Sequence, residues 1–154
     1  GGVVLATTTL VFGVILGLVD RYSSHSRSIA DIGLRIALLV GFAQALALVP
    51  GTSRSGITMT AALLLGLGRS DAARFSFLLS MPIIAAAGSY KLLELLQHGS
   101  DVGWQLLVIC LAVSAVTAYA CISVFMKWVE RVGMMPFAIY RVVLAIIIYA
   151  VVLA

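Results

Sequence analysis

Residues 50–56 read Pro-Gly-Thr-Ser-Arg-Ser-Gly, and this polar stretch interrupts a long apolar run. As helices, residues 36–49 before the break would advance about 21 Å and residues 57–67 after it about 16 Å. A helix that crosses the ~30 Å hydrocarbon core of a bilayer needs about 20 residues. Neither half is long enough, so residues 36–67 are predicted to form a re-entrant helical hairpin whose tip lies deep in the membrane. Irregular backbone at that depth must be surrounded by protein or by a water-filled cavity.

The composition of the chain indicates a membrane location. Of its 154 residues, 62% are hydrophobic and 10% are charged, whereas about a quarter of the residues of an average soluble domain are charged. Soluble globular enzymes, nucleic-acid-binding domains and disordered chains are therefore excluded. The formal net charge is +4, but the basic residues occur singly between apolar runs, which is typical of interfacial anchors and argues against a nucleic-acid partner.

Four further apolar stretches are expected to cross the membrane as helices, because every backbone amide in hydrocarbon must be satisfied internally. We therefore expect one all-α integral membrane domain over residues 1–154, a helical bundle that includes the re-entrant hairpin. The expected spans are residues 1–19, 72–97, 104–126 and 136–153. The loops at 20–35, 68–74 and 127–135 then share one face and carry most of the basic residues. The positive-inside rule places that face, and the entrance of the hairpin, in the cytoplasm.

Several residues outside the hairpin have structural interpretations. Gly13 and Gly17 have the small-residue spacing that lets a second helix approach closely. Ser70 is predicted to be the N-cap of the helix that follows the hairpin. Arg74 and Arg141 lie near predicted helix starts, so both are expected to extend their side chains to the membrane surface.

The charged residue at the hairpin tip, Arg54, is the main functional candidate. A charge near the bilayer centre costs at least ~2.5 kcal/mol, and such residues mark functional sites by default. The unpaired amides at the start of the returning helix, expected at Gly56, Ile57 and Thr58, face the tip beside Arg54. A helix N-terminus with an arginine is a site for an anion, phosphate above all. The hydroxyl-bearing and glycine neighbours that complete the candidate site are Gly51, Thr52, Ser53, Ser55, Gly56 and Thr58.

Two structural alternatives stay open for this cluster. Arg54 could cap carbonyls of a neighbouring helix, and Ser55 could act only as an N-cap. Two known phosphate motifs are excluded. Residues 51–56 have the spacing of a P-loop, but Ile57 stands where the lysine is required and no strand precedes it. Membrane acid phosphatases that use a phosphohistidine need a downstream histidine and aspartate, which residues 57–67 lack.

Three stretches of the chain resemble one known family. They are Ala-Leu-Val-Pro-Gly-Thr-Ser-Arg-Ser-Gly-Ile-Thr at 47–58, Arg-Phe-Ser-Phe-Leu-Leu-Ser-Met-Pro at 74–82 and Pro-Phe-Ala-Ile-Tyr-Arg at 136–141. The chain resembles the C-terminal half of the bacterial undecaprenyl-pyrophosphate phosphatases, the bacitracin-resistance family. The resemblance implies a membrane hydrolase that converts undecaprenyl pyrophosphate to undecaprenyl phosphate and phosphate, which recycles the lipid carrier for peptidoglycan synthesis. It also implies a bacterial cell (inner) membrane location and one repeat of an inverted-repeat architecture.

The resemblance also implies roles for residues and partners. Ser53 and Arg54 would be catalytic, and the other members of the candidate site would bind substrate with them. In the family the other hairpin carries paired glutamates, serines and a histidine. A divalent cation, Mg²⁺ or Ca²⁺, is therefore expected to be bound by carboxylates outside this chain, with no metal ligand inside it. The expected partners are the lipid pyrophosphate, membrane lipid, the N-terminal half of the same protein and a second copy in a homodimer. The fragment alone is expected to be inactive.

A second function would use the same anion site. A repeat of a membrane transporter or lipid flippase could bind an anionic headgroup at such a hairpin during translocation. Glutamates and a nucleophile in the other half would favour hydrolysis, and their lack would favour transport.

Overall fold

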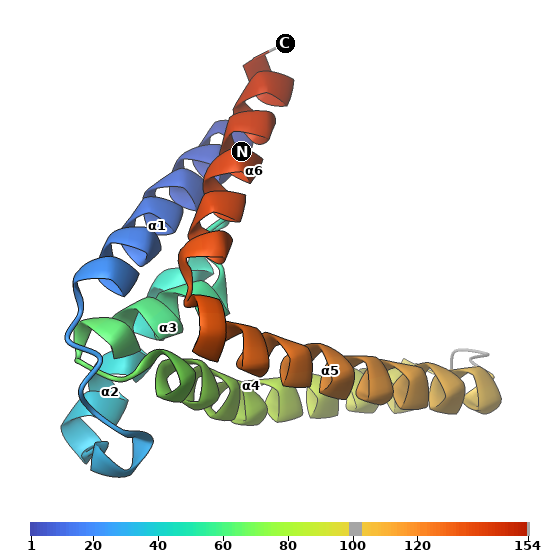
Figure 1. Ribbon diagram of the computed structural model, residues 1–154. Coiled ribbons are helices and arrows are strands. Elements are labelled where there is room, and N and C mark those ends of the chain that lie inside the picture. The colour runs from blue at the N-terminus through green and yellow to red at the C-terminus, as the bar shows by residue number, and fades with distance from the viewer. Residues whose placement is uncertain (99–102, 154) are drawn as a thin grey trace.

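The computed structural model describes residues 1–98 and 103–153 and confirms an all-helical fold. In chain order the elements are α1 (Gly2–Tyr22), η1 (Ile29–Asp31), α2 (Leu34–Gln44), η2 (Ala45–Leu48), α3 (Arg54–Leu64), α4 (Arg69–His98), α5 (Trp104–Val132) and α6 (Met135–Leu153). Among the described residues, α1, α4, α5 and α6 are long and apolar enough to cross a membrane. α1 and α6 lie side by side in one arm of the fold and α4 and α5 in another, with α3 where the arms meet (Figure 1). The protein is therefore a multi-pass membrane protein.

Two short helices, α2 and α3, pack against each other on either side of a break at residues 45–53. The prediction that the returning helix begins at residue 57 is wrong, because residues 54–56 of the polar stretch already form the first turn of α3. α2 and α3 each contain 11 residues, which is about 16 Å of helix and too short to cross the hydrocarbon core. α2 continues into the 3-10 turn η2 before the chain reaches the tip. α3 begins directly after Ser53, whose side chain caps its first turn. Entry and exit of this hairpin through one membrane face stay a prediction.

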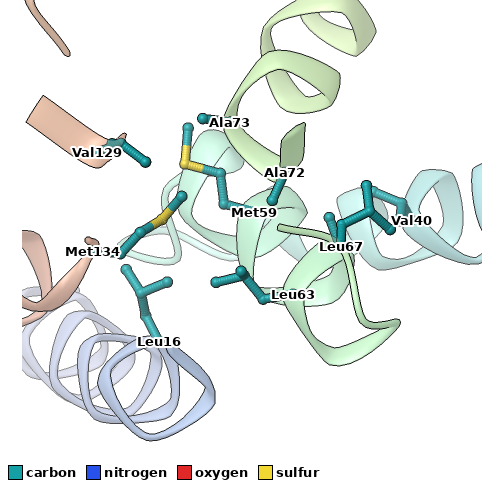
Figure 2. Close-up of a cluster of buried hydrophobic side chains, with 10 residues drawn as sticks. Leu16, Val40, Met59, Leu63, Leu67, Ala72, Ala73, Val129 and Met134 are labelled. Carbon is teal, nitrogen blue, oxygen red and sulfur yellow. The ribbon is translucent and has the colours of Figure 1, made fainter. Parts of the chain in front are cut away.

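The main buried cluster surrounds α3, and further buried residues follow the contact between α1 and α6, among them Ala6, Ala138 and Ala145. Met59 and Leu63 of α3 meet Leu16 of α1 and Met134 of the α5–α6 connection (Figure 2). From Met81 onward α4 is exposed almost throughout, and the apolar window of α5 has no buried residue. The closely packed part of the described chain is therefore α3 with its surroundings and the α1–α6 pair, and the outer parts of α4 and α5 are exposed.

Small residues allow α1 and α6 to approach each other, as the sequence spacing predicts. A Cβ atom added to Gly13 would lie 2.9 Å from Cβ of Arg141, and one added to Gly17 would lie 3.2 Å from Cβ of Ala138. Contacts below 3.0 Å do not occur between real side chains without a shift of the backbone. The glycines therefore let α6 pass close enough to bring Arg141 toward the hairpin.

A buried carboxylate joins three separate parts of the fold. Asp20, at the end of α1, is 1% exposed and accepts a hydrogen bond from Arg69 Nε at 2.7 Å. Its second oxygen accepts one from the backbone amide of Met134 at 3.2 Å. The sequence places Asp20 in a polar loop, whereas the structure places it in the last turn of a helix. Its hydrogen-bond partners come from α4 and the α5–α6 connection. Asp20 therefore fixes the relative positions of the two arms.

Substitution of Asp20 is expected to destabilise the protein. Asp20→Asn keeps the shape but removes the charge that strengthens the hydrogen bonds to Arg69 and Met134, so the free energy of unfolding should fall by about 2 kcal/mol. A denaturant titration in detergent measures this loss. Asp31→Asn is the matched control, because Asp31 is exposed and only caps the short turn η1. Equal losses in the two variants would contradict a special role for Asp20.

Two further helix boundaries, the start of α4 and the end of α5, differ from the sequence predictions. α4 begins at Arg69, so Ser70 lies inside the first turn and is not the N-cap; its hydroxyl instead donates to Glu130 Oε1 at 2.9 Å. The loop expected at 127–135 is helical as far as Val132, because its first residues are charged and apolar types that a helix accepts. The residue that follows, Gly133, has a φ of +77° and terminates α5.

Candidate functional site

Two threonines of α1 hold the hairpin tip. Thr8 Oγ donates to the carbonyl of Pro50 at 2.6 Å. Thr9 Oγ lies 2.7 Å from the Leu5 carbonyl of its own helix and 3.2 Å from the carbonyl of Gly51, so the single hydroxyl hydrogen is shared between them. Gly51 has φ +94°, a left-handed conformation that glycine adopts without a steric penalty. A Cβ atom at this position would also collide with the Thr8 hydroxyl. Gly51 is therefore required both by its conformation and by the close approach of α1.

Arg141 holds the same tip from α6. Its side chain is buried, with 9% exposure. Nη2 donates to the carbonyl of Gly51 at 2.8 Å, and Nη1 donates to the carbonyl of Thr52 at 3.0 Å. The expectation that Arg141 extends to the membrane surface is wrong, because the carbonyls that accept its hydrogen bonds lie inside the fold. A Cβ atom at Gly56 would lie 2.5 Å from Arg141 Nη1, so Gly56 leaves the room that the guanidinium needs.

These contacts allow the hairpin tip to bind a negatively charged group. The carbonyls of residues 50–52 all accept hydrogen bonds from α1 or α6, which partly offsets their negative charge and reduces their repulsion of an anion. The expectation that the amides of Gly56 and Ile57 are unpaired is wrong, because they donate to Ser53 Oγ at 3.4 Å and to the Ser53 carbonyl at 3.0 Å. The amides of Arg54 and Ser55, which precede them, have no partner in the described part of the chain. The start of α3 also carries the positive end of the helix dipole.

A cavity of about 190 Å³ opens at the start of α3. One end is polar and the other is apolar, and no carboxylate is among the described residues that line it. Among the described residues of its wall, Arg141 is the one charged side chain, so this part of the cavity is positive. The polar end is formed by Ser53, Ser55, Gly56 and Arg141, and the rest of the wall by Leu16, Met59, Phe125, Met134, Phe137 and Tyr140.

Two exposed serines present their hydroxyls at the polar end. Ser53 Oγ and Ser55 Oγ lie 3.4 Å apart, and both residues are exposed. Ser53 has φ +59°, a conformation that costs a non-glycine residue energy and is concentrated at functional sites. Since Ser53 is the N-cap of α3, the alternative in which Ser55 serves only as the cap does not apply. Ser55 is therefore free of a capping role and faces the cavity.

The two threonines of the candidate site lie inside the protein and support the tip. Thr52 is 1% exposed, and its hydroxyl donates to the carbonyl of Val49 at 2.7 Å. Thr58 is also 1% exposed, and its hydroxyl lies 2.6 Å from that of Ser76 in α4. The sequence reasoning missed Ser76, although a serine between two phenylalanines in an apolar helix is the kind of signal that could have indicated a buried hydrogen bond.

Arg54 faces away from the serines. Its half-buried side chain lines a second cavity, of about 440 Å³, together with residues of α2, η2 and α4 that include Gln44 and Ile83. No hydrogen bond joins the Arg54 guanidinium to another described residue, so it caps none of the described helices of this chain. Arg54 and the serines nevertheless occupy consecutive positions, so all three side chains begin at the same positive helix end.

Comparison with known proteins assigns the family. Residues 1–147 match the family described as bacitracin resistance protein BacA. The chain belongs to the BacA family. Three similar proteins are all named undecaprenyl-diphosphatase. Those of Teredinibacter turnerae and Saccharophagus degradans are 53% identical over 146 residues and 54% identical over 149 residues, covering 95% and 97% of this chain. That of Hahella chejuensis is 55% identical over 141 residues, covering 92%.

The match to the BacA family involves only part of each relative. The aligned residues make up 55%, 56% and 53% of the three relatives in the order given. The chain therefore spans about half the length of the BacA relatives it matches.

The described part of this BacA chain does not fit a metal ion at the hairpin tip. Residues 1–98 and 103–153 contain no group of three His, Cys, Asp or Glu side chains arranged to hold one. The carboxylates of Asp20, Asp71 and Glu130 lie around the start of α4, where Arg69 and Ser70 bind two of them. The chemistry that this chain offers at the tip is that of hydroxyls, amides and arginines.

Proposed function

We propose that this chain supplies the phosphate-binding hairpin of an enzyme that hydrolyses undecaprenyl pyrophosphate to undecaprenyl phosphate and phosphate. The enzyme would act in the bacterial inner membrane and recycle the lipid carrier for peptidoglycan synthesis. The main support is the positive, carboxylate-free cavity at the start of α3, where hydroxyls and open amides meet a buried arginine. The names of the BacA relatives support the same reaction.

In this reaction the oxygen of a water molecule bonds to the terminal phosphorus as the bridging phosphorus–oxygen bond breaks. The bridging oxygen leaves with the prenyl phosphate, and the water oxygen departs in inorganic phosphate. Negative charge develops on the phosphoryl oxygens and on the leaving oxygen. Ser53 and Ser55 would donate hydrogen bonds to these oxygens, as would the open amides of α3. Donors of this kind, fixed before the reaction, each typically contribute about 10²- to 10³-fold to turnover.

Arg54 would supply charge and geometry to the same headgroup. A guanidinium can bind two phosphate oxygens at once through its planar fork. Its position beside the second cavity places it on the other side of the α3 start from Ser55. A pyrophosphate bound over this helix end would therefore meet the serines on one side and Arg54 on the other, with Gly51, Thr52, Gly56 and Thr58 maintaining the shape of the tip.

The remaining parts of the active site would lie outside this chain. We propose that carboxylates of the N-terminal half of the protein hold a divalent cation, Mg²⁺ or Ca²⁺, which would offset the charge of the pyrophosphate. The described residues contain no group of three His, Cys, Asp or Glu side chains that could hold this ion. A homodimer is a further proposal.

Release of phosphate from undecaprenyl pyrophosphate by the native full-length protein tests the proposal. Ser53→Ala should lower turnover at least tenfold, because it removes a hydroxyl at the polar end of the cavity and the cap of α3. Ser123→Ala is the matched control, since Ser123 bonds only to its own helix, at the Tyr119 carbonyl. Full activity of Ser53→Ala would contradict the assignment of Ser53.

The same preparation separates hydrolysis from transport. Movement of a labelled lipid pyrophosphate between leaflets without release of phosphate would support the transporter or flippase alternative and reject the hydrolase.

A further inference from the structure

The cavity beside Arg54 contains a second polar side chain, that of Gln44. Gln44 is the last residue of α2 and Arg54 is the first residue of α3, so they lie on either side of the break at the hairpin tip. Both side chains line the same cavity. The other described residues of its wall are glycine, alanine, leucine and isoleucine, at Gly41, Ala45, Ala47, Leu48 and Ile83. Among the described residues, Gln44 and Arg54 therefore supply the polar side chains of this wall.

The side-chain amide of Gln44 has no hydrogen-bond partner in the described part of the chain. Gln44 directly precedes the turn η2, but its side chain does not cap that turn, and it bonds to no other described residue. The side chain is half-buried. An amide that lies among apolar side chains without a hydrogen bond costs free energy. Gln44 therefore needs a partner that the described residues do not supply.

The neighbouring guanidinium determines the charge of that partner. The side chain of arginine has hydrogen-bond donors and no acceptor, and the amide nitrogen of glutamine is also a donor. No carboxylate is among the described residues that line this cavity. Donors from two residues, one of which is positively charged, favour an anion with several acceptor oxygens. A phosphate group is an anion of this kind.

Hydrogen bonds within the break fix the end of α2 relative to the start of α3. The Thr52 hydroxyl lies 2.7 Å from the Val49 carbonyl and 3.1 Å from the Leu46 carbonyl, so its single hydrogen is shared between them. The Val49 amide also donates to the Leu46 carbonyl at 3.1 Å. The turn η2, which begins directly after Gln44, is thus bonded to a residue two positions before Arg54. The backbone positions of Gln44 and Arg54 are therefore set before an anion binds.

We propose that Gln44 binds the same phosphate group of the lipid pyrophosphate as Arg54, with its amide nitrogen donating a hydrogen bond to a phosphate oxygen. This inference rests on the proposed function and adds a substrate-binding residue to it. Arg54 supplies the positive charge and the planar fork, and Gln44 supplies a donor that carries no charge. Ser55 lines the other cavity, so Gln44 acts together with Arg54 and not through the serines.

Binding of methylenediphosphonate, a non-hydrolysable analogue of pyrophosphate, to the native full-length protein in detergent tests this role. Calorimetry at one fixed concentration of Mg²⁺ gives the dissociation constant. Gln44→Met should raise that constant about tenfold, because a hydrogen bond to a charged group is lost. Gln44→Glu should raise it at least about fivefold further, because a carboxylate has nearly the same shape as the amide but repels the anion.

Gln105→Met and Gln105→Glu are the matched controls. Gln105 is an exposed glutamine in the first turn of α5, so both of its variants should bind methylenediphosphonate as the unsubstituted protein does. An unfolding titration shows whether each variant is folded under the conditions of the binding measurement. If Gln44→Met does not fold, the comparison of Gln44→Glu with Gln105→Glu decides the result.

Two results would overturn the role of Gln44. One is unchanged binding of methylenediphosphonate by both Gln44 variants; if inorganic phosphate alone then binds more weakly, Gln44 contacts the released product and not the substrate. The other is an equal loss of affinity in Gln44→Met and Gln44→Glu, which would indicate a change of packing. The expected order of affinities without phosphate release from undecaprenyl pyrophosphate would support the role of Gln44 and reject the proposed hydrolysis.

Discussion

Arg54→Lys is expected to lower the hydrolysis of undecaprenyl pyrophosphate on the order of 10²-fold, although it retains the positive charge. The ammonium group of lysine is a compact point charge and cannot replace the planar fork that binds two phosphate oxygens together. Donors that act on charge developing in the transition state have effects of this size. Because the Arg54 guanidinium bonds to no other described residue, the free energy of unfolding should change little.

Steady-state phosphate release by the full-length protein, with a parallel unfolding titration, measures both effects. Arg35→Lys is the matched control, since Arg35 is an exposed arginine in the first turn of α2 and away from the α3 start. Turnover within threefold of the unsubstituted protein would reject a role for Arg54 in the reaction. A large loss of stability would instead mean that Arg54 supports the fold.

The sequence predicts the helical fold and the broken helix because these depend on local properties. The length of the apolar runs limits which segments can cross a membrane, and the polar stretch 50–56 cannot continue a lipid-facing helix. The predicted start of α3, at residue 57, is three residues too late, because Ser53 and Ser55 are equally suitable N-cap types and the sequence does not choose between them.

Long-range hydrogen bonds could not be predicted in the same way. Arg141 bonds to carbonyls 89 and 90 positions away, and Asp20 bonds to Arg69, 49 positions away. Nothing in the flanking sequence of Arg141 indicates these acceptors, so an extended side chain at the membrane surface was the expectation from local sequence. Only the close passage of α6 past Gly13 and Gly56 brings the guanidinium to the tip.

The division of the site between two cavities could be predicted only in part. Successive residues of a helix point about 100° apart, so Arg54 and Ser55 at the start of α3 cannot face the same way. The sequence contains this information, but it does not indicate which neighbouring helices form the two walls. α5 and α6 provide the wall beside Ser55, and α2, η2 and α4 provide the wall beside Arg54.

Arg141→Met should lower both stability and turnover, because it removes the donors that hold the hairpin tip while it retains an apolar stem. The carbonyl of Thr52 would lose the hydrogen bond that Arg141 donates to it, and the carbonyl of Gly51 would keep only the bond from Thr9. A buried acceptor left without a partner costs about 1–3 kcal/mol, so the free energy of unfolding should fall by about 2–4 kcal/mol. A displacement of the tip by about 1 Å can lower turnover 10²-fold.

The test must separate a displacement of the hairpin tip from a general loss of protein stability. Turnover is therefore measured at a temperature at which the unfolding curve shows each variant to be fully folded. Under that condition Arg141→Lys should recover part of the activity that Arg141→Met loses, because an ammonium group can still donate to one of the two carbonyls. Thr9→Val is the matched control. It removes one donor from the Gly51 carbonyl while Arg141 remains, so its turnover should fall less than threefold. Normal turnover of folded Arg141→Met would show that the arginine stabilises the fold without positioning the tip.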